Sequence, residues 1–158
     1  EVHDAVSAED PAPTCDALVT TRPGVALCVR VGDCVPLVLA DVATGVVAVA
    51  HVGRPGVVAG VVAATLDHLA ARGATHLEAW VGPHICGGCY EVPGPMRDEV
   101  SAVVPAAFSC TTWGTPSVDI GAAVVAQLRA GGFADVAMLS KPCQPSDAAE
   151  AGPRVVAA

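Results

Sequence analysis

Two short apolar runs separated by a brief connection limit the folds open to this chain more than any other feature. Residues 35–40 and 46–51 are both rich in Val, Leu and Ala, and only residues 41–45 join them. A parallel crossover needs a dozen or more residues, whereas an antiparallel pair can be closed by a short turn. The pattern therefore predicts a β-hairpin.

Apolar and turn patterns elsewhere predict further strands and helices. Strands are expected at the start of the chain and at residues 17–20, 25–31, 76–81 and 136–139. Helices are expected from the Gly-Arg-Pro-Gly segment at 53–56 to Gly73, and at 96–103 and 118–130. The expected fold class is α+β, with mixed, mainly antiparallel sheets and helices packed on their faces.

Length and charge exclude several classes of function. The chain has 158 residues and a net charge of −8, with 53% hydrophobic residues, which suits one domain with a sizeable core. Its acidic balance argues against non-specific nucleic-acid binding, and its single lysine, Lys141, against a polybasic membrane patch. The richest apolar stretch, 42–66, is interrupted by His51 and Arg54, so no membrane span is expected. The oligomeric state is not predicted.

Seven cysteines, an odd number without a visible signal peptide, are typical of reduced thiols in a cytoplasmic protein. Cys86 and Cys89 form a C-x-x-C motif in a segment that also contains His84. A structural zinc ribbon needs a second such pair, and a thioredoxin-like motif precedes a long helix, so both are disfavoured. We expect loop thiols that line a cavity, with a redox or second metal role as the alternative.

The hairpin brings together two reactive side chains. If Val42 and Ala43 centre the turn, Cys34 lies opposite His51, with Cβ atoms about 5 Å apart on one sheet face. With a third ligand, for which His3 is the candidate, the pair suits a zinc site with an open position. Without metal, the imidazole suits deprotonation of a cysteine nucleophile. A packing role for both residues is the remaining alternative.

Four segments in order carry a resemblance to a known family. They are residues 1–4 (EVHD), 32–36 (GDCVP), 50–56 (AHVGRPG) and 82–92 (GPHICGGCYEV). Across about residues 1–143 the chain resembles the laccase-domain family, once called multicopper polyphenol oxidoreductases and now interpreted as purine nucleoside phosphorylases.

The resemblance implies a single zinc ion held by His3, Cys34 and His51. It also implies phosphorolysis of adenosine, inosine and methylthioadenosine, together with adenosine deamination, so that the expected partners are purine nucleosides and inorganic phosphate. A metal-free cysteine hydrolase that uses Cys34 and His51 is one alternative. A copper-dependent polyphenol oxidase ranks last, because five histidines are few for a multicopper set.

Two further residues are candidates for substrate binding. Arg54 is expected to contact an anion, helped by the N-terminus of the helix predicted there, although a solvated arginine is an equal alternative. Asp33, beside Cys34, is expected to support the metal ligands or to accept a proton.

The chain also departs from the family pattern. Arg54 stands where the family has Trp, and Glu1 where it has Gln. Residues 1–143 are expected to be a family core truncated at its N-terminus, and 144–158 a divergent or disordered tail. An inactive remnant that only binds its ligand is therefore a further alternative.

Overall fold

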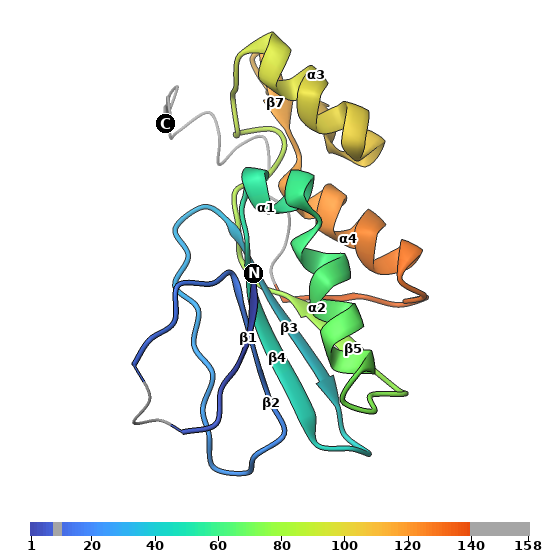
Figure 1. Ribbon diagram of the computed structural model, residues 1–158. Helices are drawn as coiled ribbons and strands as arrows, with labels where there is room; N and C mark the ends of the chain where they lie inside the picture. The colour runs from blue at the N-terminus through green and yellow to red at the C-terminus, as the bar shows by residue number, and fades with distance from the viewer. Residues whose placement is uncertain (8–10, 140–158) are drawn as a thin grey trace.

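The computed structural model describes residues 1–7 and 11–139. Within them a mixed six-stranded sheet has the order β1-β2-β4-β3-β5-β8, and a small antiparallel sheet pairs β6 with β7 (Figure 1). The strands are β1 (Val2–Asp4), β2 (Ala17–Thr20), β3 (Val35–Asp41), β4 (Val46–Val52), β5 (Glu78–Val81), β6 (Phe108–Cys110), β7 (Pro116–Val118) and β8 (Ala137–Met138). The helices are α1 (Arg54–Ala59), α2 (Val61–Ala70), α3 (Gly94–Val103), the 3-10 turn η1 (Pro105–Ala107) and α4 (Ile120–Ala130). The predicted α+β class is confirmed.

The hydrophobic core lies between the main sheet and the helices. Along β3 and β4 every second side chain is buried, and α2 packs on β4 across this buried face. Helix α4 packs against α2, while α3 stands with β6 and β7 at the far end of the molecule (Figure 1). Most core residues are Val, Ala or Leu, whose compact aliphatic side chains suit two layers in close contact.

The hairpin is confirmed, but its predicted register is wrong by two positions. Pro36, not Cys34, lies opposite His51, because Asp41 pairs with Val46 and the loop therefore contains residues 42–45. A shift of two positions keeps each side chain on its predicted face.

The strand predicted at 25–31 is also wrong. The segment alternates between half-buried and exposed residues, as a strand would, but no neighbouring strand bonds to it among the described residues. Alternation of exposed and half-buried side chains does not by itself provide a neighbouring strand. The strand that pairs with β2 on this side of the sheet is β1, not residues 25–31.

The helix predicted to begin at 53–56 is broken in two. Gly60 ends α1 and precedes α2. Its φ of 75° is a left-handed conformation that favours glycine.

The hairpin β6–β7 was not predicted, because its strands are only three residues long. The predicted tail, 144–158, lies outside the described residues. Within those residues no helix combines the length and apolar character that a membrane crossing requires.

Asp41 fixes the loop of the central hairpin. The residue is buried, with 1% of its surface exposed. One carboxylate oxygen accepts hydrogen bonds from the backbone N–H groups of Ala43 and Thr44, and the other from those of Thr75 and His76. The bonds from His76 and Thr75, more than those from the hairpin loop, hold the pKa of Asp41 far below its usual range. One carboxylate thus joins the β3–β4 turn to the segment that leads into β5.

We expect Asp41→Asn to lower the melting temperature at pH 7 by roughly 5–10 °C, because the new NH₂ group faces two N–H donors. The carboxylate stabilises the fold above the ordinary Asp pKa of about 3.9, and this contribution is lost as the pH falls further. The difference between the variant and the wild type should therefore shrink between pH 5 and pH 2 in thermal melts. Asp135→Asn, an exposed position, is the control. Equal melting temperatures for Asp41→Asn and the wild type at pH 7 would contradict the prediction.

Candidate active site

Cys34 and His51 converge at one end of the central hairpin. Cys34 directly precedes β3, and His51 is the next-to-last residue of β4. A Cβ on Gly53 would lie 3.0 Å from the Cys34 Sγ atom and 3.6 Å from the His51 Cε1 atom, so both side chains border one small space. Because the register differs from the predicted one, they meet diagonally rather than face to face.

His3 lies on the same face of the sheet but two strands away. Val2 pairs with Ala17, which is buried in the core, so His3 points to the opposite face, as His51 does. Strand β2 separates β1 from β4, which places the two strands about 10 Å apart. On the helix-facing side, Asp4 forms an ion pair with Arg72 and thereby anchors β1 to the end of α2.

The fit of these residues to a metal ion is partial. A thiolate and an imidazole are both zinc ligands, and Cys34 and His51 border the same small space beside Gly53. In residues 1–7 and 11–139, however, no group of three His, Cys, Asp or Glu side chains forms a metal-binding arrangement. The fold thus assembles two of the three predicted ligands and leaves His3 apart.

Asp16 is a neighbour of His51 that the sequence analysis missed. It precedes β2; its Oδ1 atom lies 3.8 Å from the His51 Nδ1 atom, and its carbonyl accepts the His51 backbone N–H. A carboxylate in this position favours one ring orientation, with the Nδ1 atom directed toward Asp16. The only sequence signal was its place directly before a predicted strand.

Cys34 opens onto a cavity of about 260 Å³. The cavity is lined by Asp33, Cys34, Arg54, Pro55, Ile85, Tyr90 and Ile120. These residues come from the start of β3, the start of α1, the loop before α3 and the start of α4. The two predicted substrate-binding residues, Asp33 and Arg54, therefore lie beside the thiol. Ile85, Tyr90 and Ile120 were not predicted, because they come from distant parts of the chain.

The cavity combines apolar walls with opposite charges. Arg54 is the first residue of α1 and forms no ion pair within the described part of the chain. Helix α1 ends at Ala59 and is too short to add much dipole, so an anion would depend on the guanidinium itself.

The environment of Cys34 favours the thiol over the thiolate. Burial, and to a smaller extent the Asp33 carboxylate, raises the pKa of the Cys34 thiol. Cysteine nucleophiles need the opposite shift. This disfavours the metal-free hydrolase.

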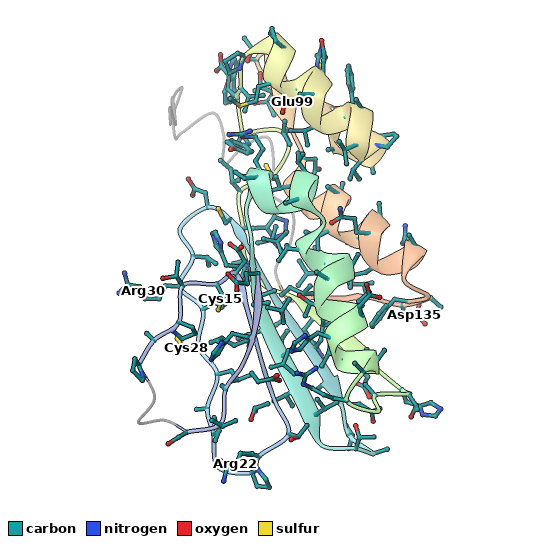
Figure 2. The ribbon with its side chains drawn as sticks, in the orientation of Figure 1. Cys15, Arg22, Cys28, Arg30, Glu99 and Asp135 are labelled. Atoms are coloured by element: carbon teal, nitrogen blue, oxygen red, sulfur yellow. The ribbon has the colours of Figure 1, made fainter. Side chains whose placement is uncertain are left out.

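The other predicted thiols and histidines lie outside this cavity. Cys86 and Cys89 border a tight turn in which the Cys89 N–H donates to the Cys86 carbonyl, and neither residue lines the cavity beside Cys34. The His84 Nδ1–H donates to the Gly82 carbonyl at 2.7 Å. All six described cysteines lack a disulfide. Figure 2 shows two of them, Cys15 and Cys28, on the loop segments beside β1 and β2.

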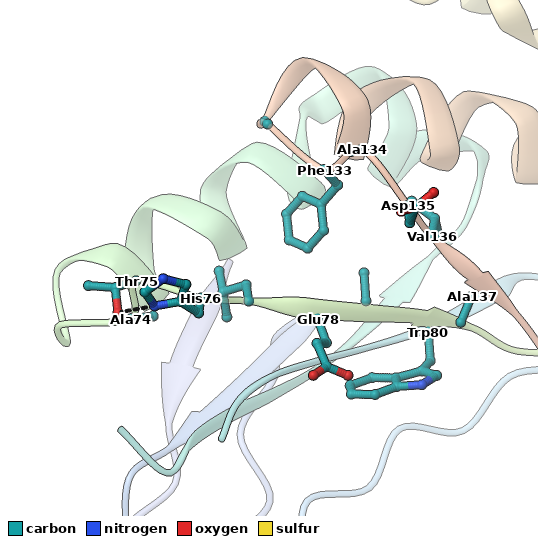
Figure 3. A pocket seen from close by; sticks show the side chains of 14 residues that line it. Ala74, Thr75, His76, Glu78, Trp80, Phe133, Ala134, Asp135, Val136 and Ala137 are labelled. Atoms are coloured by element: carbon teal, nitrogen blue, oxygen red, sulfur yellow. Dashed lines mark hydrogen bonds between the residues drawn. The ribbon is translucent and has the colours of Figure 1, made fainter. Parts of the chain in front are cut away.

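A larger cavity, of about 670 Å³, lies elsewhere, between β5 and the segment that follows α4. Phe133 points toward β5, whereas Glu78 and Trp80 point away on the other side of that strand (Figure 3). None of the five predicted site residues lines this cavity. The smaller cavity is therefore the candidate site.

Comparison with known proteins finds one matching family model and several named relatives. The model of the family described as multi-copper polyphenol oxidoreductase laccase matches residues 1–149. A Streptomyces coelicolor protein named purine nucleoside phosphorylase is 52% identical over 136 residues, which cover 85% of this chain and 56% of that protein. A protein named adenosine deaminase, from an unknown prokaryotic organism, is 43% identical over 79 residues, or 49% of this chain and 30% of that protein.

A solved structure shows the same fold. The crystal structure of YlmD from Geobacillus stearothermophilus matches with a TM-score of 0.77 and 24% identity, over 90% of this chain and 59% of that one. The chain spans about half the length of the curated relatives that it matches.

Proposed function

Because this chain belongs to the multi-copper polyphenol oxidoreductase laccase family, we propose that it is a zinc-dependent purine nucleoside phosphorylase that also deaminates adenosine. The observation that carries the proposal is that Cys34 lies near His51 beside Gly53 and also lines a cavity together with Arg54. Relatives named for these two activities support the substrate class. We propose a cytoplasmic location, in keeping with the free thiols.

We propose zinc, rather than copper, as the metal. Cys34 and His51 would hold it, with His3 as the third ligand after a movement of β1 toward the pair. When bound, zinc would supply a Lewis acid and an activated water at neutral pH. Asp16 would keep the His51 ring oriented from its other nitrogen.

In the proposed phosphorolysis, a phosphate oxygen bonds to C1′ of the ribose while the bond from C1′ to N9 of the purine breaks. The electron pair leaves with the base, which takes up a proton, and ribose 1-phosphate is formed. Arg54 would hold the phosphate dianion, and Asp33 would accept a proton or support the ligands. The guanidinium suits this role because it can form two parallel hydrogen bonds with phosphate oxygens.

The test measures base release from adenosine, inosine and methylthioadenosine by the zinc-loaded chain. We expect release to depend on inorganic phosphate and to yield an equal amount of sugar phosphate: ribose 1-phosphate from adenosine and inosine, and 5-methylthioribose 1-phosphate from methylthioadenosine. Conversion of adenosine to inosine with release of ammonia, independent of phosphate, would reveal the deaminase activity. A chain that releases no base at any phosphate concentration would contradict the phosphorylase proposal.

Arg54→Ala is expected to raise KM for phosphate by roughly 10- to 100-fold, since a hydrogen-bonded charge is removed. KM for the nucleoside should change far less, and Arg54→Lys should recover part of the loss. Arg129→Ala removes an exposed arginine at the end of α4 and serves as the matched control. Steady-state kinetics with each substrate varied separately provides the measurement. An unchanged KM for phosphate in Arg54→Ala would exclude the proposed role.

A further inference from the structure

Tyr90 stands out among the residues that line the cavity beside Cys34. It is the only aromatic residue of the seven and the only tyrosine of the chain. The tyrosine is therefore the one flat π-surface that the described cavity offers to a ligand.

The backbone of Tyr90 is fixed from two sides. Its N–H donates to the Cys86 carbonyl at 3.1 Å, and its carbonyl accepts the Val118 N–H at 3.2 Å. The next residue, Glu91, forms an isolated bridge with Ser117 of β7. The side chain is half-buried and packs against the core. The backbone that carries the ring is thus held by the turn at 86–89 and by β7, which lowers the entropy that the residue loses when a ligand binds.

The rest of the cavity divides into an apolar part and a charged part. Ile85, Ile120 and Pro55 supply aliphatic surface, while Arg54 and Asp33 supply charge beside the thiol. The volume of about 260 Å³ lies below the roughly 300–1,000 Å³ of sites for drug-sized ligands. The aliphatic surface suits a flat heteroaromatic base, and the charged side chains suit polar groups attached to it.

We propose that Tyr90 is the base-binding residue of this site and that its ring stacks on the purine. This inference rests on the proposed phosphorylase function, whose substrates carry a purine. Stacking uses the π-face rather than hydrogen bonds, so adenine and hypoxanthine nucleosides are both accepted. Selection between them would fall to other groups.

Kinetics of Tyr90 variants form the first part of the test. Tyr90→Ala should raise KM for inosine and adenosine by roughly 10- to 100-fold, the range of aromatic–base stacking, and leave KM for phosphate within about twofold. Tyr90→Phe should behave as the wild type, since it keeps the ring, whereas Tyr90→Leu should resemble Tyr90→Ala although it fills more of the space than alanine does. Phe108→Ala, which removes an exposed aromatic residue outside the cavity, is the control.

A binding measurement forms the second part and does not depend on turnover. Because the chain contains one tyrosine, labelling with 3-fluorotyrosine gives a single ¹⁹F resonance from position 90. We expect this resonance to shift on titration with adenine or inosine and to stay in place with inorganic phosphate or ribose 5-phosphate. The wild-type sequence is used, so the result is independent of how the variants fold.

The outcomes separate this inference from the proposed function. Phosphate-dependent base release that Tyr90→Ala and Tyr90→Leu leave unchanged, or an unmoved resonance at saturating inosine, would overturn the role of Tyr90 and leave the phosphorylase intact. A resonance that shifts with purines in a chain without turnover would support Tyr90 as the base-binding residue and remove the catalytic proposal.

Discussion

Replacing Cys34 with alanine is expected to abolish both metal binding and nucleoside turnover. The Cys34 sulfur is the sulfur donor that lies near His51 beside Gly53, and among the described residues no group of three potential ligands could hold the ion without it. We expect the zinc content to fall from about one ion per chain to a small fraction. Phosphorolysis should fall by more than about 100-fold, since even the loss of an outer partner of a metal ligand costs 10- to 100-fold. Metal analysis and the phosphate-dependent assay measure the two effects.

Cys110→Ala is the matched control, because it removes an exposed thiol from β6. It should keep the zinc content and the activity of the wild type. Full turnover by Cys34→Ala would refute the metal proposal. If chelation leaves the activity intact while Cys34→Ala destroys it, the metal-free cysteine hydrolase replaces the zinc enzyme.

His3→Ala is a separate arm of the same experiment. It should lower the zinc content as Cys34→Ala does if β1 moves to complete the site. Retained zinc in His3→Ala would show that the third ligand comes from elsewhere and that β1 stays with β2, held by Asp4 and Arg72.

The second large effect is the loss of stability expected when Gly121 is replaced, because the His84 ring lies where a side chain at this position would begin. A Cβ at this position would overlap the His84 Nε2 atom and lie 2.9 Å and 3.0 Å from the Cδ2 and Cε1 atoms of the ring. The ring is tethered by its Nδ1–H bond to the Gly82 carbonyl and would have to break that bond to move away. Gly121→Ala is expected to destabilise the fold by about 3 kcal/mol and to lower the melting temperature by roughly 6–12 °C.

This result would run against helix propensity, which favours Ala over Gly by about 0.5–1 kcal/mol inside a helix. Gly94→Ala is the matched control, because it also lies in a helix but would meet nothing closer than Pro116 at 3.9 Å. It should melt at or above the temperature of the wild type. Thermal melts of both variants decide the point, and a Gly121→Ala protein as stable as Gly94→Ala would contradict the predicted overlap.

The hairpin and the helices were predictable because their causes are local. The Val- and Leu-rich runs at 35–40 and 46–51 are joined by a short link, which favours a hairpin over other structures. Gly73 and Gly131 lie just past helices, as expected. The strand predicted at 25–31 failed because a strand also needs a partner, which its own residues do not specify. The register failed by two positions because the Asp41 side chain, with its bonds to residues 43 and 44, selects a four-residue loop.

For the candidate site, the sequence by itself determined the chemical types and the shared face of Cys34 and His51, because alternation along a strand survives a shift of two positions. Only the tertiary structure decided that they lie diagonally opposite beside Gly53, and that Tyr90 and Ile120 line the cavity next to Cys34. It also placed Asp16 next to His51 and left His3 across an intervening strand. The physical reason is the separation along the chain. Side-chain periodicity depends on neighbouring residues, whereas contacts between distant elements depend on how the sheet and helices pack around one core.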